Sequence, residues 1–237
     1  MGVKRKPSKK VIILTAAALT AAVCGFWLLS SPSRERDYVA SAQEAMIEDL
    51  MQNIQQAENA PEETAEMDAD DFAEDYNGVE DEEIYIPIFE PVFSGPIADG
   101  SFPADIAGIG ILSIESIDLR LPIAEGVDED SLLIAPGRVP QTAQIGDIGN
   151  AVIAGHRNYT FGSMFNRLGE LHIGDIVQYQ ARNGELMEFA VFEIAVIEPE
   201  NQIAFIQPLN DSVITLYTCT PAREATHRLI IRAQRIS

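Results

Sequence analysis

Residues 213–232, VITLYTCTPAREATHRLIIR, decide the fold of this chain. The apolar, β-branched run at 213–218 predicts a buried strand that ends at Cys219. Pro221 cannot continue a central strand, so the polar residues after it form a loop. A second apolar run at 229–231 predicts the returning strand, with Arg228 at its start, nine residues after the cysteine. This stretch therefore predicts a thiol and a guanidinium side by side at one end of a sheet.

A thiol beside a guanidinium suits chemistry on a carbonyl. A thiolate can attack the carbonyl carbon, and a fixed cation with several N–H donors can stabilise the oxyanion that forms. Cys219 and Arg228 are thus candidate catalytic residues, and the enzymatic interpretation expects an activated thiol of lowered pKa. The alternative is an inert, buried cysteine.

The C-terminal part of the chain predicts an all-β domain. Beyond residue 100, short apolar runs alternate with Gly, Pro, Asp and Asn, which is typical of a barrel or a sandwich. Two short helices are expected at 128–133 and 163–171. The predicted strands cover residues 107–114, 117–123, 151–154, 175–181, 188–197, 213–219 and 229–236.

The N-terminal third differs in composition from the predicted all-β domain. Basic residues in 1–10 precede about nineteen uncharged residues, long enough at ~1.5 Å per residue to cross a bilayer, so we expect a cytoplasmic tail at 1–10 and a transmembrane helix at 11–30. A cleaved signal peptide is the alternative. Residues 34–59 predict an amphipathic helix with one apolar face. That face comprises Val39, Ala42, Met46, Leu50 and Ile54.

Carboxylates dominate the segment that follows. From Glu58 to Glu90 they lack counter-charges, which favours an extended linker. The apolar, proline-punctuated residues 84–93 carry a second hypothesis, a lid that folds over the site. Residues 31–102 are therefore expected to hold a juxtamembrane helix and an acidic linker, and residues 103–237 the globular domain.

Composition restricts the partners and the kind of site. The net charge of -21 argues against nucleic acid, which needs clustered Lys and Arg. The two cysteines, Cys24 and Cys219, are unlike a disulfide framework because Cys24 falls in the hydrophobic segment. Three scattered histidines and one accessible cysteine show no metal-ligand spacing.

His156 is the candidate proton carrier. It follows the apolar residues 150–154 and Gly155, and so occupies on its strand the place that Cys219 has on another. His227 is a rival because it lies eight residues from Cys219, but neighbouring strand residues face opposite ways, so it should point away from the face of Arg228. His172 lies in a turn and is expected at the surface.

Several of these motifs together resemble one family. The sequence TLYTCTP at 215–221, followed by Arg228, resembles the Thr-Leu-x-Thr-Cys signature of sortases, the membrane-anchored cysteine transpeptidases of Gram-positive bacteria. AGHR at 154–157 is similar to their histidine strand, and GDIGN at 146–150 to the turn before it. The resemblance covers residues 104–236, including IGIL at 109–112 and LPIAEG at 121–126.

The resemblance implies a closed eight-stranded sortase-type β-barrel with short helices, preceded by the transmembrane helix and the acidic linker. It also implies that Cys219 attacks a Leu-Pro-x-Thr-Gly-like sorting signal, that His156 transfers protons, and that Arg228 stabilises the oxyanion. Thr218 would contact the substrate. The implied partners are secreted surface proteins or pilins that bear a sorting signal, the amine of a peptidoglycan precursor and the cell membrane, with the catalytic domain outside the cell.

The sequence does not decide the sortase subclass or whether the protein binds Ca²⁺. Residues 226–229, THRL, after Cys-Thr-Pro resemble the pilus-assembling class C sortases, whereas residues 156–167 are more similar to class D. We favour a housekeeping-type or class D-like enzyme that anchors proteins to the cell wall, with a pilin polymerase that uses a pilin lysine as the alternative. No cofactor is expected, although Glu198 and Glu200 could take part in a Ca²⁺ site as in some class A relatives.

Two other functions compete with the transpeptidase. A non-catalytic barrel that binds partners at the cell surface would need no reactive thiol. A papain-type protease is disfavoured because its cysteine precedes its histidine in the chain, and here His156 comes first.

Overall fold

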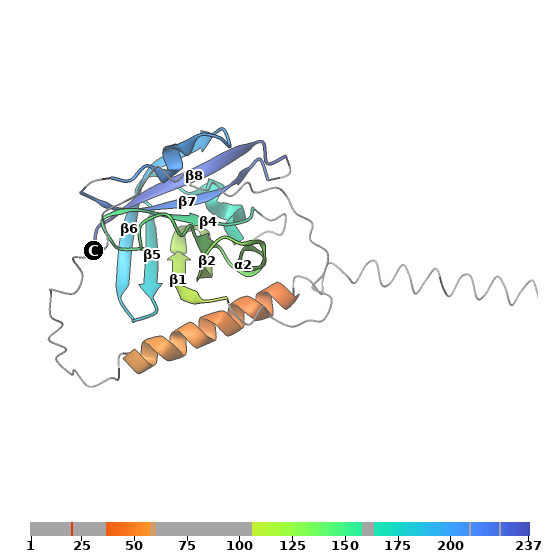
Figure 1. Cartoon of the computed structure of the whole chain (residues 1–237), viewed down its shortest axis with the longest axis vertical. Helices are drawn as coiled ribbons and strands as arrows, with labels where there is room; N and C mark the ends of the chain where they lie inside the picture. The colour runs from red at the N-terminus through yellow and green to blue at the C-terminus, as the bar shows by residue number, and fades with distance from the viewer. Residues whose placement is uncertain are drawn as a thin grey trace, which may run out of the picture.

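The computed structural model describes residues 20, 37–57, 59, 106–157, 164–208, 210–222 and 224–237 (Figure 1). The predicted transmembrane helix at 11–30, the acidic linker and the lid at 84–93 lie outside these residues, residue 20 apart. None of the helices in the described ranges has both the length and the hydropathy that a membrane crossing requires.

Eight strands form a closed barrel, which confirms the predicted eight-stranded barrel and excludes the sandwich. Around the barrel the strands follow the order β1-β2-β3-β4-β7-β8-β6-β5. Their bounds are Gly108–Ile114 (β1), Leu119–Glu125 (β2), Gly137–Arg138 (β3), Gly149–Ala154 (β4), Ile176–Ala181 (β5), Leu186–Ile197 (β6), Ser212–Thr220 (β7) and His227–Arg235 (β8).

Seven of the strands match the predicted ones within a few residues. The eighth, β3, was missed because two residues are too few to show any alternation of apolar and polar side chains. β2 starts two residues later than expected, because the 3-10 helix η1 (Glu115–Ile117) and the left-handed Asp118, at φ 49°, turn the chain first.

The short helices also lie near their predicted places. α2 (Glu129–Ile134) begins at Asp128, whose carboxylate accepts from the backbone N–H of Ser131 and caps the first turn. The segment predicted at 163–171 is a 3-10 helix, η2 (Met164–Glu170), with a kink at Phe165. A further 3-10 helix, η3 (Gln202–Phe205), lies between β6 and β7 and was not predicted.

Strand direction brings the candidate residues to one rim. β4 and β7 pair in parallel, with Ala154 opposite Tyr217, so their C-terminal ends meet at the same edge of the barrel. β7 and β8 pair antiparallel, which places the start of β8 at that edge as well.

Apolar side chains form clusters on the two faces of β4 and β7. The barrel interior holds the larger cluster, to which these strands contribute Ile153, Ile214 and Leu216. The alternate residues, including Val152 and Tyr217, face outward. There they are covered by residues of α2 and η3, so this part of the sheet is buried on both faces.

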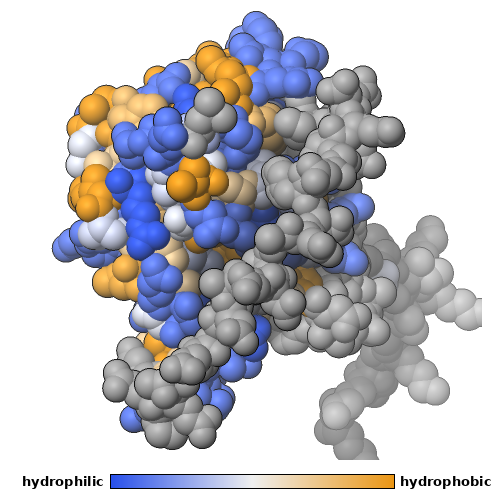
Figure 2. Space-filling view, turned by 60° about the vertical axis from the view of Figure 1, so that its left-hand side comes forward, coloured by the Kyte–Doolittle hydropathy of each residue, from blue (hydrophilic) through white to orange (hydrophobic). Residues whose placement is uncertain are grey.

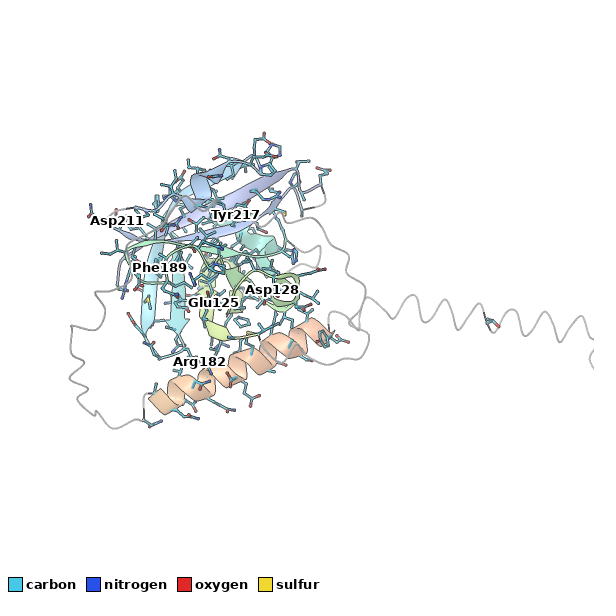
Figure 3. All side chains as sticks on the ribbon, in the orientation of Figure 1. Glu125, Asp128, Arg182, Phe189, Asp211 and Tyr217 are labelled. Carbon is cyan, nitrogen blue, oxygen red and sulfur yellow. The ribbon has the colours of Figure 1, made fainter. Side chains whose placement is uncertain are left out.

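The predicted amphipathic helix forms over residues 37–57 and packs across one end of the barrel, beside β1 (Figure 1). Its apolar face is buried at Ala42, Leu50 and Ile54. Gly108 of β1 lets the helix approach, since a Cβ there would lie 3.2 Å from Cδ1 of Leu50. Arg182, just after β5, reaches the helix and forms an ion pair with Asp49 at 3.6 Å (Figure 3).

The face of the domain in Figure 2 mixes hydrophobic and hydrophilic residues. The exposed apolar side chains of the described residues are distributed over several elements. They include Ile148, Ile173, Ile176, Leu186, Phe192, Val196 and Ile206.

Candidate active site

Cys219 is the second-last residue of β7 and lies on its outward face. Only 9% of the residue is exposed, so the thiol is buried at the rim rather than presented on the surface. Arg228 lies directly opposite Cys219 in the pairing of β7 with β8, and its residue is 4% exposed. The structure thus brings together the sulfur and the guanidinium that the sequence pattern paired.

Backbone hydrogen bonds fix one nitrogen of the Arg228 guanidinium. Its Nη1 donates to the carbonyl oxygens of Ala225 at 2.9 Å and His227 at 3.0 Å. Its Nε is buried and has no hydrogen-bond partner among the residues that the structure describes. A buried donor of this kind is suited to an oxygen that carries negative charge, since an unmet buried donor is otherwise unfavourable.

His156 follows β4 by two residues. The pairing with β7 continues through the N–H of Gly155, which donates to the carbonyl of Tyr217 at 3.1 Å. The next residue, His156, therefore stands at the level of Cys219 on the neighbouring strand. A Cβ on Gly155 would lie 2.9 Å from the ring of Phe165 and 3.1 Å from Pro136, so a larger residue does not fit before the histidine.

Thr218 lies between Tyr217 and Cys219 and therefore takes the inner face of β7, with Ile214 and Leu216. It is 1% exposed, and its Oγ1 donates to the carbonyl of Gly155 at 2.7 Å. The sequence interpretation assigned Thr218 to substrate contact. The structure places its hydroxyl on the backbone that precedes His156.

Burial dominates the electrostatics of the two reactive groups. Burial raises the pKa of the Cys219 thiol, and the positive charges of Arg228 and Arg157 oppose part of that rise. The expectation of a lowered pKa is therefore wrong for the free protein, because desolvation outweighs both cations. Burial also lowers the pKa of His156. Near neutral pH the dominant form has a neutral thiol and a neutral imidazole.

The other two histidines lie at the surface. Nε2 of His227 is 3.3 Å from Oε1 of Glu198, and Nδ1 is 2.9 Å from the hydroxyl of Thr226. His227 pairs with Thr220 rather than with Cys219, so it occupies the alternate position on β8. His172 is exposed in its turn, as expected.

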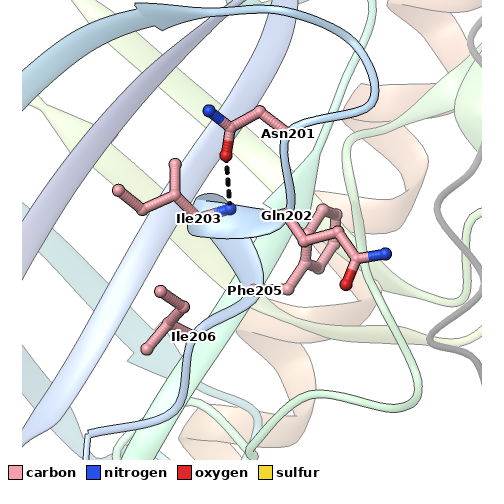
Figure 4. Close-up of a pocket in the computed structure, with 5 residues that line it drawn as sticks. All are labelled: Asn201, Gln202, Ile203, Phe205 and Ile206. Carbon is pink, nitrogen blue, oxygen red and sulfur yellow. Dashed lines mark hydrogen bonds between the residues drawn. The ribbon is translucent and has the colours of Figure 1, made fainter.

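η3 covers the outward face of β7, and the sequence pattern did not reveal it. The rings of Phe205 and Tyr217 lie 5.7 Å apart, which connects η3 to the face that carries Cys219. A shallow apolar pocket opens on η3 (Figure 4). It is lined by Asn201, Gln202, Ile203, Phe205 and Ile206.

A buried amide network holds η3 on the sheet. Asn150, fully buried on β4, donates from Nδ2 to the carbonyls of Ala204 at 2.7 Å and Ile206 at 3.2 Å, and its Oδ1 accepts from the hydroxyl of Thr215 at 2.7 Å. Gln207 exchanges hydrogen bonds with the backbone of Asn150. In the sequence, Gly149-Asn150 at the start of a predicted strand gave no indication that Asn150 holds η3.

Carboxylates and histidines do not gather into a metal site within the described ranges, where no group of three or more His, Cys, Asp or Glu residues could hold an ion. Glu198, one of the two glutamates considered for calcium, lies instead against His227.

Comparison with known proteins identifies this arrangement. Residues 112–236 match the family model described as the Sortase domain. Sortase D of Bacillus subtilis is 32% identical over 131 residues, which are 54% of this chain and 64% of that protein, so the chain spans less than two thirds of that relative's length.

Two solved structures are similar to the barrel. Sortase A from Corynebacterium diphtheriae, a lid mutant, has a TM-score of 0.54 at 31% identity over 57% of this chain and 73% of its own. Sortase C of Streptococcus pneumoniae, a protein described with a pilin substrate specificity, has a TM-score of 0.52 at 28% identity over 55% and 69%.

Proposed function

Because this chain belongs to the sortase family, we propose that it is a membrane-anchored cysteine transpeptidase that cleaves an LPxTG-like sorting signal and joins the acyl fragment to an amine of a cell-wall precursor. One observation carries the proposal. The register of β7 and β8 sets Cys219 opposite Arg228, and the parallel pairing with β4 adds His156 at the same rim.

The reaction takes two steps with His156 as the proton carrier. The thiolate of Cys219 attacks the carbonyl of the Thr–Gly bond while His156 holds the proton taken from the thiol. When the C–N bond breaks, that proton goes to the leaving amine, which leaves a thioester on Cys219. The acceptor amine then attacks the thioester, gives its proton to His156 and expels the thiolate, which regains the proton.

Arg228 stabilises the oxyanion of each tetrahedral intermediate. Its anchored Nη1 holds the guanidinium in place before the substrate arrives, so the Nε–H and the positive charge need no reorganisation as negative charge develops on the oxygen. A lysine could supply the charge but not this fixed set of donors.

The pKa directions make the reactive ion pair a minority form. Thiolate and imidazolium contain the same number of protons as neutral thiol and imidazole, so the two forms exchange by a proton transfer between Cys219 and His156. Since burial raises the pKa of the thiol and lowers that of the imidazole, the neutral form is favoured. The positive charges of Arg228 and Arg157 stabilise the thiolate and so increase the fraction of the thiolate–imidazolium form.

The apolar pocket on η3 suits the apolar part of a sorting signal. Phe205 lines it and also contacts Tyr217, two residues before the nucleophile. A peptide with its leucine at this pocket would lie on the outer surface of η3 and continue past it to the rim that carries the thiol.

The proposal also places the domain at the membrane. Residues 11–30 would anchor the chain, with residues 1–10 in the cytoplasm, residues 31–102 as juxtamembrane helix and linker, and residues 103–237 as the catalytic domain outside the cell. The helix at 37–57 packs on the barrel, so the linker would leave from a helix docked on the catalytic domain.

A pilin polymerase is the second candidate. The likeness to a sortase C favours it, and it would differ in the acceptor, a lysine amine of a pilin instead of a wall-precursor amine. The enzyme would be given both amines in competition, and the products identified by mass spectrometry. The preferred acceptor distinguishes the two functions.

The test of the main proposal is cleavage of fluorogenic sorting peptides by the full chain in detergent. Cys219→Ala should abolish cleavage, and His156→Ala should lower kcat/KM by about 10³-fold or more. His172→Ala and His227→Ala are the matched controls and should stay within about twofold of wild type. Full activity of His156→Ala would refute the assigned roles, and no cleavage by wild type of any peptide in a broad library would favour a non-catalytic barrel.

A further inference from the structure

Arg157 connects three elements of the site. It follows His156 directly, and its Nη1 donates to the hydroxyl of Thr220, the residue after Cys219, at 2.7 Å. Its Nη2 lies against η2, since a Cβ on Gly169 would be 3.0 Å away. The side chain therefore bridges the segment after β4, the end of β7 and η2.

This bridge puts a second cation beside the sulfur. Arg228 approaches Cys219 from β8, and Arg157 approaches from the segment after β4, so the two guanidinium groups come from different elements. The phenol of Tyr217 on β7 also interacts electrostatically with Cys219, and Glu200 influences that phenol in turn. His156 stands at the level of Cys219 on the segment after β4. Both arginines favour the thiolate, and the burial of the sulfur opposes them.

The side chain of Arg157 is fixed in place by its hydrogen bond to Thr220. Its Nε is buried without a hydrogen-bond partner among the residues that the structure describes, while Nη1 has a close acceptor. A long, flexible side chain with one end fastened to Thr220 cannot withdraw its charge into solvent without losing that bond.

We propose that Arg157 is a positioning residue of the active site: fastened to Thr220, it joins the histidine end of β4 to the cysteine end of β7 and keeps a second positive charge beside the nucleophile. This inference rests on the proposed function, in which Cys219 is the nucleophile. A purely structural role is the competing explanation, and it predicts no dependence on charge.

Three variants separate charge from anchoring. Arg157→Gln removes the charge and keeps a donor, Arg157→Lys keeps the charge, and Thr220→Val removes the acceptor with little change of shape. Arg167→Gln is the matched control, because Arg167 is itself a residue of η2 but pairs with the exposed Glu170. All are made in a Cys24→Ala background, so that Cys219 is the one thiol that a reagent can modify.

The first measurement is the rate of alkylation of Cys219 by iodoacetamide against pH, which needs no sorting peptide. Arg157→Gln should move the midpoint up by about half to one pH unit. Arg157→Lys should move it by less than half as much, and Arg167→Gln should leave it unchanged. A wild-type midpoint in Arg157→Gln, or an equal displacement in Arg157→Lys, would overturn the electrostatic role.

The second measurement is peptide cleavage. Arg157→Gln should lower kcat/KM about 3- to 10-fold, because the population of the reactive ion pair falls about tenfold for each unit by which the thiol pKa rises. Thr220→Val should lower kcat about threefold with KM unchanged, and wild-type kcat would refute the anchoring. If wild type cleaves no sorting peptide at all, the proposed function fails, while the alkylation midpoints still decide the role of Arg157.

Discussion

Cys219 and Arg228 lie directly opposite each other in the antiparallel pairing of β7 and β8. Opposed residues share a face of the sheet and have their Cβ atoms about 5 Å apart, so this register sets the thiol and the guanidinium within reach of one carbonyl. The loop between the two strands sets this register, which pairs residues nine positions apart in the chain.

Loss of the guanidinium of Arg228 should affect the chemical step. We expect Arg228→Ala to lower kcat/KM by about 10²- to 10³-fold, since one oxyanion donor has that effect in other enzymes, and Arg228→Lys to recover only part of it. Arg232→Ala is the control, because Arg232 lies four residues along the same strand and pairs with Glu193. An equal loss in both variants would point to a general disturbance of β8.

The pKa directions predict a broad pH profile for peptide cleavage. The fraction of the thiolate–imidazolium form is constant between the two pKa values and falls outside them, so kcat/KM should be flat from about pH 6.5 to 8.5. The acid limb should lie below the ordinary histidine pKa, because burial lowers that of His156. The alkaline limb should lie above the ordinary cysteine pKa, because burial raises that of Cys219. Alkylation of Cys219 with a midpoint below pH 7 would contradict this profile.

Gly155 should tolerate no side chain. In Gly155→Ala the new Cβ would meet the ring of Phe165, which costs about 1 to 3 kcal/mol and displaces His156. Thermal unfolding should report the loss of stability, and kcat/KM should fall at least about tenfold. Adding Phe165→Leu should relieve the clash, so the double variant should be less destabilised than the sum of the single changes. Additive losses would show that the ring is not the obstacle.

Asn150 should be important for stability although it is far from the chemistry. Asn150→Ala removes two side-chain donors and an acceptor that hold η3 and Thr215, so we expect a loss of about 2 to 3 kcal/mol in urea unfolding. Asn53→Ala is the control, because Asn53 donates to Asp49 on the exposed side of the helix at 37–57. A wild-type midpoint for Asn150→Ala would mean that η3 is held by its apolar contacts alone.

The helix at 37–57 should unfold together with the barrel. Leu50 is fully buried against β1, so Leu50→Ala should lower the free energy of unfolding by about 2 to 4 kcal/mol. Met51→Ala, at a neighbouring residue that is 36% exposed, should change it by less than about 0.5 kcal/mol. An unchanged stability in Leu50→Ala would indicate a helix that packs on the barrel only weakly.

Local pattern was enough to predict most elements. Seven strands and the helix at 37–57 carry enough alternating or helical periodicity to be located, and Cys219 and Arg228 were placed at one end of a sheet from the turn residues between them. β3 and η3 escaped because elements of two to four residues are too short to show a period.

The direction in which the thiol's pKa moves and the bridge from Arg157 to Thr220 came only from the tertiary structure. Both depend on which strands are neighbours. The parallel pairing of β4 with β7 joins residues more than sixty positions apart, and it decides what surrounds the sulfur. A linear pattern reports the face that each side chain takes on its own strand, whereas desolvation and Coulomb interactions depend on distances between strands, which only the closed barrel sets.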